Sequence, residues 1–309
     1  MDQTRRNARF YLDQNILGYI GDGQFQVPEN IEIDWIYSDE HFNEISRGDA
    51  AKFLAVLHSL RARKIRFVLN DQNQLSDEAT IDPFQNPFEF YEQYMEAKEE
   101  VSFDETIFLD VLRRIFGAEN FESVSALPER CQHQIDSLVS PFVEDFPQLK
   151  ELPRFVSSEL NKTFASQLND IPSLIKIRKA LGADQLHQTD FRSDDSIAEI
   201  WQIIGNRFPG ISIDQFFGFS PYTDGHEPRS TVSGIIGCHL ALNLIGYCAD
   251  RRPSGDARLR RTLSDGQHIA YAAFCEAVVS EDDNFCRRAK AIYSYANIPT
   301  QVCRLIRRK

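Results

Sequence analysis

Residues 9–13 have the sequence RFYLD, an apolar run that ends in an acidic side chain. Such a run predicts a buried strand, with Asp13 at its carboxyl end, which is where open α/β sheets bind ligands. Periodicity and capping signals place the next strands and helices over residues 14–20, 31–37, 50–63 and 65–69, with a further helix after Ser38 that carries Glu44. This alternation of strands and helices predicts an α/β fold with a central parallel sheet.

Four acidic side chains lie in two segments that are far apart in the sequence. Asp13 and Glu44 are near its start, and Asp265 and Asp282 are near its end. Hard divalent cations take oxygen ligands and keep several waters, so a few carboxylates around an open position are the usual protein contribution. Carboxylates packed together would repel one another without a cation. The set therefore predicts a site for one or two Mg²⁺ or Mn²⁺ ions.

The two segments resemble the PIN-like nuclease family. The run 13–15 (DQN) matches the Asp-x-Asn that follows its first strand, and Glu44 stands where a helix glutamate follows the second strand. Residues 265–273 match a helix that opens with Asp, and 278–285 match a short strand ending in Ser-x-Asp with a later aromatic residue. The match covers residues 8–46 and 263–293. The chain departs from the family pattern in the roughly 220-residue gap between Glu44 and Asp265, which is far longer than in minimal members.

The resemblance implies a metal-dependent nuclease that hydrolyses phosphodiester bonds, with RNA as the expected substrate and water as the nucleophile. Asp13, Glu44, Asp265 and Asp282 would be both the catalytic residues and the metal ligands. Two alternatives remain open. One is a non-catalytic PIN-like module that binds RNA or a protein, and the other is a helical interaction protein in which the PIN-like part is only a scaffold.

Each of these acids also has a simpler interpretation. Asp13, Asp265 and Asp282 could cap helices, and Glu44 could be a solvated helix acid. The neighbours expected to orient the ligands are Asn15, His268, Ser280 and Asp283. Of these, Asn15 and Ser280 could equally be caps, and His268 could equally be a structural histidine.

The middle of the chain differs from its two ends in composition and in its predicted secondary structure. Residues 71–86 are polar and predict an exit loop, and helical patterns follow at 87–98, 104–116, 129–140, 155–168, 172–181 and 194–205. We therefore expect a nuclease domain made of residues 1–70 and 205–309, with residues 71–204 as a large, mainly helical insertion. This insertion could serve a protein partner or self-association.

Charge is distributed unevenly. The chain has a net charge of −12, but residues 71–200 alone carry 26 acidic and 11 basic side chains, a net charge of −15, and the remainder is at +3. A basic loop of Arg251, Arg252, Arg258, Arg260 and Arg261 precedes Asp265. It is either a solvated loop or a set of contacts to nucleic-acid phosphates.

Several other classes are disfavoured. The six cysteines include no C-x-x-C pair, which disfavours a zinc site and favours buried free thiols. There is no P-loop, G-x-S-x-G or H-E-x-x-H motif. No apolar run approaches the ~20 residues that cross a bilayer, so we expect no membrane insertion. The first residues do not resemble a secretory signal, so a cytoplasmic protein is expected.

Overall fold

A computed structural model of the chain describes residues 7–27, 32–72, 74–100, 127–162, 178–179, 195–221, 229–249 and 256–306. Six strands form one mixed sheet in the order β4-β3-β2-β1-β5-β6. They are β1 (Ala8–Leu12), β2 (Ile33–Tyr37), β3 (Arg63–Leu69), β4 (Leu75–Ile81), β5 (Ala277–Ser280) and β6 (Gln301–Arg304). All neighbours are parallel except β3 and β4. The predicted α/β class is confirmed, and the sheet, predicted to be parallel, is mostly parallel with one antiparallel edge strand.

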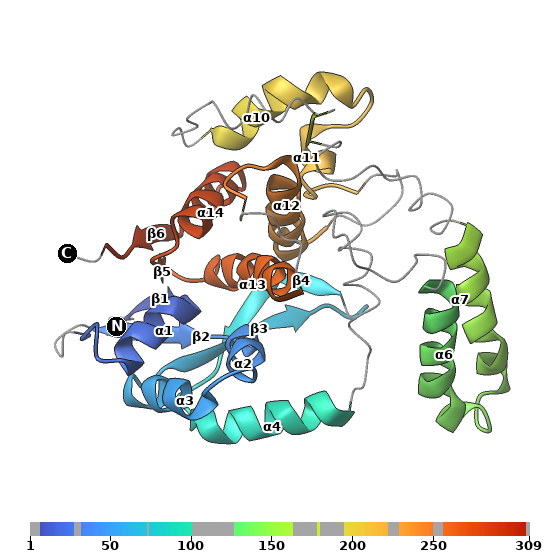
Figure 1. Cartoon of the computed structure of the whole chain (residues 1–309), viewed down its shortest axis with the longest axis horizontal. Helices are drawn as coiled ribbons and strands as arrows, with labels where there is room; N and C mark the ends of the chain where they lie inside the picture. Colours follow the sequence, from blue (N-terminus) through green and yellow to red (C-terminus); the bar gives the residue numbers. More distant parts are fainter. Residues whose placement is uncertain are drawn as a thin grey trace, which may run out of the picture. The chain divides into compact units, whose positions relative to one another are not determined.

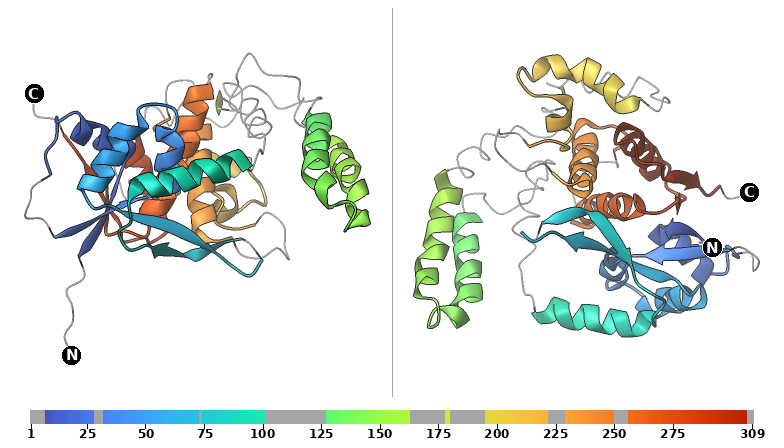
Figure 2. Two further views of the ribbon diagram at one scale, coloured as in Figure 1. Left: turned by 90° about the horizontal axis from the view of Figure 1, so that it is seen from below. Right: turned by 180° about the vertical axis from the view of Figure 1, so that it is seen from behind.

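Helices cover both faces of this sheet, and Figures 1 and 2 show α1 to α4 on one face and α12 to α14 on the other. The helices of the first face are α1 (Gln14–Gly21), α2 (Asp39–Ile45), α3 (Ala50–Ser59) and α4 (Pro87–Glu100). Those of the second are α12 (Thr231–Ile245), α13 (Asp256–Ala272) and α14 (Asp283–Tyr295), with α10 (Ser196–Ile204), η5 (Gly205–Arg207) and α11 (Ile213–Phe216) preceding them in the chain.

The strand order places a topological switch point between β1 and β5. From β1 the chain builds outward through β2 and β3, and it later returns to add β5 and β6 on the other side of β1. In open α/β sheets the crevice outside the carboxyl ends of the two strands at such a point is where ligands bind. Asp13 follows β1 and Glu281 follows β5, so the two segments singled out in the sequence meet at the carboxyl ends of these two strands.

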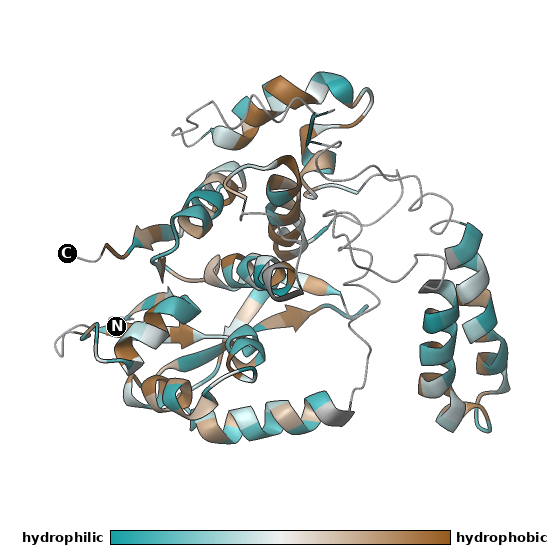
Figure 3. Ribbon diagram, viewed as in Figure 1, coloured by the Kyte–Doolittle hydropathy of each residue, from teal (hydrophilic) through white to brown (hydrophobic). Residues whose placement is uncertain are grey.

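The pleat of β1 explains how one strand contributes both to the core and to polar contacts with α13. Leu12 points into the apolar core under α1 and α3, with Leu17, Phe42 and Leu57. Tyr11, its neighbour, points to the opposite face, where its hydroxyl contacts α13. In Figure 3 brown and teal residues occur both on the strands of the sheet and on the helices that cover it. The alternation in RFYLD thus separates packing from polar contacts.

The division of the chain differs from the predicted insertion at residues 71–204. The chain folds into two compact units, one of Met1–Lys98, Leu181–Asp250 and Thr262–Lys309, the other of Glu99–Ala180 and Arg251–Arg261. Residues 75–81, predicted to lie in an exit loop, form β4 and pair with β3. This correction has a physical reason: Leu75, Ala79 and Ile81 alternate with polar residues, which is a strand pattern on a half-exposed edge.

The described part of the second unit is helical. It contains α6 (Leu127–Val139), η2 (Ser140–Phe142), η3 (Pro147–Glu151) and α7 (Leu152–Leu160), and α6 and α7 pack side by side (Figure 1). The helices predicted at 104–116 and 172–181 lie largely or wholly outside the described residues. Within those residues, no helix combines the length and apolar character needed to cross a membrane.

Candidate functional site

Asp13 joins the two halves of the site. It is 5% exposed, and its Oδ2 accepts hydrogen bonds from Ser280 Oγ at 2.6 Å and from Asn15 Nδ2 at 3.0 Å. Its backbone N–H donates to the Val279 carbonyl, which ties the end of β1 to β5. Although Asp13 occupies the position before α1, its side chain makes no capping hydrogen bond. The carboxylate is thus held by Asn15 and Ser280, two of the four residues expected to orient the ligands.

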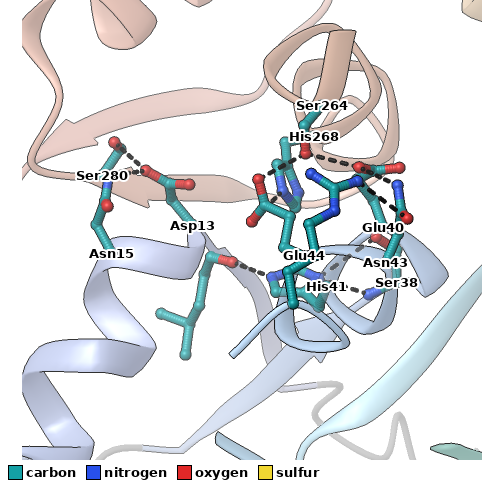
Figure 4. A network of polar contacts seen from close by, with 12 residues as sticks. Asp13, Asn15, Ser38, Glu40, His41, Asn43, Glu44, Ser264, His268 and Ser280 are labelled. Atoms are coloured by element: carbon teal, nitrogen blue, oxygen red, sulfur yellow. Dashed lines mark hydrogen bonds and ion pairs between the residues drawn. The ribbon is translucent and has the colours of Figure 1, made fainter. Parts of the chain in front are cut away.

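Glu44 faces Asp13 from α2 (Figure 4). Its Oε1 accepts from Ser264 Oγ at 2.7 Å, and its Oε2 lies 3.4 Å from His268 Nε2. Ser264 and His268 are one helical turn apart on α13 and therefore share a face. The side chain of Glu44 is 20% exposed and that of His268 is 1% exposed. Glu44 is therefore held from both sides, rather than being a solvated acid.

Burial and neighbouring charges set the protonation states. Burial raises the pKa of Asp13, the charge of His268 and the Ser280 hydrogen bond oppose this, and Glu44 and Asp282 add repulsion. Burial also acts to raise the pKa of Glu44, but the charge and hydrogen bond of His268 outweigh it and lower the pKa to about 2. Against the effect of burial, Glu44 and Asp13 raise the pKa of His268 to about 9. Asp13, Glu44, Asp282 and His268 thus form one electrostatic cluster.

Asp265 has a different partner. It lies well inside α13, which begins at Asp256, so the interpretation of Asp265 as a helix N-cap is wrong. Its Oδ2 binds Arg288 Nη2 at 2.8 Å, and Arg288 is 0% exposed while Asp265 is 14% exposed. Arg288 Nη1 also donates to the Cys248 carbonyl. Asp265 therefore compensates a fully buried cation.

Asp282 caps α14, as its simpler interpretation predicted: its Oδ1 accepts from the Phe285 N–H at 3.0 Å. Its own N–H donates to Ser280 Oγ, the hydroxyl that also binds Asp13. Asp283, the next residue, forms an ion pair with Arg304 at 2.6 Å in which both side chains are 49% exposed. Asp283 thus faces solvent with Arg304 instead of orienting the ligands.

The basic segment before Asp265 is helical where it is described. Arg258, Arg260 and Arg261 belong to α13, which corrects the prediction of a loop, and Arg251 and Arg252 lie outside the described residues. Leu259 and Thr262, both buried and three residues apart, show why this stretch continues the helix. Arg261 is exposed and stands one turn before Asp265 on the same helix.

The donor chemistry of the cluster suits a hard divalent cation, because Asp13, Glu44 and Asp282 all offer carboxylate oxygens. Their placement is less complete: within the described ranges, no group of three or more His, Cys, Asp or Glu side chains could hold a metal ion. Both oxygens of Glu44 face Ser264 and His268, and one oxygen of Asp282 caps α14. Binding of a cation by three of these donors would require at least one of the carboxylates to change its position.

Some residues of the site were missed in the sequence. Tyr11 and Ser38 contact each other beneath the cluster, and Arg288 binds Asp265. Ser264 Oγ lies 2.7 Å from Glu40 as well as from Glu44, so its single hydroxyl hydrogen is shared between the two carboxylates. A usable signal existed for Arg288, since it falls on the apolar face of α14 with Phe285, Ala289 and Ile292. A buried arginine on such a face demands an acidic partner. The partner of Tyr11 lies 257 residues away in the sequence, and no local pattern indicates it.

The pair of His268 and Glu44 predicts a pH dependence of stability. The pKa of folded His268 lies above its usual 6.5. Its contribution to the free energy of unfolding is therefore complete below pH 6.5 and is lost as the pH rises through about 9. The pKa of folded Glu44 lies below 4.5, so its contribution is complete above pH 4.5 and is lost as the pH falls through about 2. In urea unfolding, the stability difference between wild type and His268→Gln should shrink between pH 6.5 and 9. A difference that stays constant over this range would contradict the ion pair.

Comparison of the chain with protein-family models, with curated proteins and with solved structures gives no match.

Proposed function

We propose that this chain is a metal-dependent nuclease that hydrolyses phosphodiester bonds, with RNA as its substrate, as the resemblance to PIN-like nucleases implies. One observation carries the proposal: Ser280 Oγ binds Asp13 Oδ2, which joins the two matching sequence segments at the topological switch point of the sheet. Glu44 and Asp282 lie close enough to perturb the pKa of Asp13. Buried acids gathered at a ligand-binding crevice are a frequent mark of active sites.

In this proposal Asp13, Glu44 and Asp282 would hold Mg²⁺ or Mn²⁺. When bound, such an ion lowers the pKa of water and stabilises charge on phosphoryl oxygens. Asn15 and Ser280 orient Asp13, and Ser264 and His268 orient Glu44. Asp265, predicted as a fourth ligand, contributes instead by compensating Arg288 beside the site.

The experiment is a cleavage assay on labelled single-stranded RNA and on DNA of the same sequence, with Mg²⁺, Mn²⁺ or EDTA. We expect cleavage of RNA with either metal ion and none with EDTA. Cleavage that persists in EDTA would contradict a metal-dependent reaction. Preferential cleavage of DNA would retain the nuclease and correct its substrate.

A second candidate is a non-catalytic module of the same fold that binds RNA or a protein. It is favoured by the lack, among the described residues, of three donors that could hold one metal ion, and by the Arg288 contact that occupies Asp265. RNA binding without cleavage under any metal condition would support this candidate over the nuclease.

Substitution of the arginines on α13 separates phosphate binding from catalysis. If Arg258, Arg260 and Arg261 contact the RNA backbone, replacing all three by glutamine should weaken binding of every sequence tested. The slope of log K against log salt should flatten by about 2, since each single-strand phosphate contact contributes ~0.7. Turnover at saturating RNA should change much less. Unchanged salt dependence together with lost turnover would show that these arginines do not act by binding phosphates.

A further inference from the structure

Behind Glu44 and His268 runs a buried chain of polar side chains, and three of its members, Tyr11, Ser38 and His41, have no role in the proposed reaction so far. Tyr11 Oη lies 2.7 Å from His268 Nδ1 and 2.7 Å from Ser38 Oγ. Tyr11, Ser38 and His41 are all 0% exposed, and His268 is 1% exposed. Burying so many polar groups is costly unless each is hydrogen-bonded. This series of polar side chains connects the end of β1 to the carboxylate of Glu44.

The far end of this chain is fixed. His41 Nδ1 accepts from the backbone N–H of Ser38 at 3.1 Å, so the ring carries its proton on Nε2, which donates to the Leu12 carbonyl at 2.7 Å. Figure 4 shows His41 in this bridging position between the two backbone groups. His41 is therefore a neutral, immobile end point, and its backbone partners hold both β1 and the start of α2.

At the end of this series nearest Glu44, the hydrogen bonds can accommodate either protonation state of His268. When His268 carries a proton only on Nε2, Tyr11 donates its hydroxyl hydrogen to Nδ1 and accepts from Ser38. When both ring nitrogens are protonated, Nδ1 donates to Tyr11, and Tyr11 donates to Ser38. In both arrangements the ring keeps its orientation, and an Nε2–H points at Glu44 Oε2, 3.4 Å away. Only the direction of the hydrogen bonds changes.

We propose that Tyr11 is a positioning residue for the cleavage reaction: by fixing the ring of His268, it holds the carboxylate of Glu44 in its place opposite Asp13. This inference rests on the proposed function. Glu44 is on a helix and has three rotatable bonds, so without His268 its carboxylate would keep, among the described residues, only the hydrogen bond from Ser264. Groups that orient a ligand in this way commonly contribute 10- to 100-fold to metal affinity or activity.

The test is Tyr11→Phe, which removes one hydroxyl from the chain and keeps the ring. A matched control is Tyr293→Phe. Tyr293 is 2% exposed, and its hydroxyl donates to the Ile269 carbonyl at 2.6 Å, one residue from His268 but with no contact to its ring. Both variants therefore lose one buried hydroxyl beside the same helix. Only Tyr11→Phe removes the partner of His268 Nδ1.

We expect Tyr11→Phe to lower kcat about 10- to 100-fold with KM within about twofold, and to weaken Mn²⁺ binding measured without RNA by a similar factor. Tyr293→Phe should change neither by more than about twofold. Equal losses of kcat or Mn²⁺ affinity in the two variants would overturn the positioning role, because a purely structural effect would weaken both alike.

His268→Gln supplies the second variant and shows whether Tyr11 acts through His268. The glutamine amide can still donate to Glu44, but there is no imidazole ring for Tyr11 to hold in place. Adding Tyr11→Phe to His268→Gln should therefore reduce kcat by less than about threefold, a strong coupling of the two sites. An undiminished effect in this background would overturn the inference.

A readout independent of cleavage separates this inference from the proposed function. The ¹⁵N chemical shifts of the His268 ring report which nitrogens carry protons. Relative to wild type, they should change in Tyr11→Phe and stay unchanged in Tyr293→Phe. If the wild type fails to cleave RNA, the proposed function is wrong, while the shifts and the Mn²⁺ affinities still decide whether Tyr11 positions His268 and Glu44. Unchanged His268 shifts in Tyr11→Phe would overturn the inference whether or not the chain cleaves.

Discussion

Replacing Arg288 by methionine is expected to lower the free energy of unfolding by about 3–5 kcal/mol, because it breaks the ion pair between this fully buried guanidinium and Asp265. Asp265→Asn should cost a similar amount, since it removes the carboxylate opposite a guanidinium that is 0% exposed. The double variant should be less destabilised than the two single losses together, because neither charge is then left behind. Urea unfolding of the four proteins measures all three quantities.

The control for this cycle is the ion pair between Arg304 and Asp283, in which both side chains are 49% exposed. Arg304→Met should cost only about 0–1 kcal/mol, as is usual for exposed pairs. If Arg288→Met behaves like Arg304→Met, the buried pair does not stabilise the fold as argued. The cycle also matters for function, because lost cleavage in Asp265→Asn would reflect unfolding unless the protein is shown to be folded.

Replacing Asp13 by asparagine is expected to have the opposite profile: loss of cleavage with retained or increased stability. Asp13 is buried, and burial together with the charges of Glu44 and Asp282 raises its pKa, so the ionised side chain is a cost in the folded state. Asparagine keeps an oxygen that can accept from Ser280 and Asn15. We expect cleavage to fall by at least about 10²–10³-fold, the range seen when a group that stabilises the transition state is removed.

Mn²⁺ links this prediction to a binding measurement. At 100 times its Kd, an ion that binds only the folded state stabilises it by about 2.7 kcal/mol, and Asp13→Asn should abolish the corresponding rise in Tm. The control is Asp22→Asn. Asp22 lies at the end of α1, the helix that follows Asp13, and it forms an exposed ion pair with Lys52 of α3. A Tm rise of equal size in Asp13→Asn and wild type would rule out Asp13 as a metal ligand.

Most elements near the candidate site could be predicted from local sequence. The strands at residues 8–12 and 33–37 and the helices after them follow from apolar periodicity, and these signals need no knowledge of distant partners. The strand at 75–81 was missed because its pattern is weak on a half-exposed edge, and its pairing with β3 completes it. The extent of α13 was missed because a run of arginines conceals its buried positions.

For the site, the sequence indicated which acids matter but not what each one contacts. Asp13, Asn15 and Ser280 meet as expected, and His268 contacts Glu44. The buried pair of Asp265 and Arg288 was not foreseen, because it depends on how α13 packs against α14. The same is true of Tyr11, whose hydroxyl contacts Ser38, which precedes α2, and His268 on α13.

The sequence by itself determined the α/β class, the strand that ends at Asp13 and the identity of the acidic residues, because each depends on local periodicity and side-chain chemistry. Only the tertiary structure decided which of these acids lie near Asp13 and which one is bound to a buried arginine. The physical reason is that polar side chains acquire their partners through packing. Ser280, 267 residues away from Asp13 in the sequence, becomes its neighbour only after β1 and β5 have paired in the sheet.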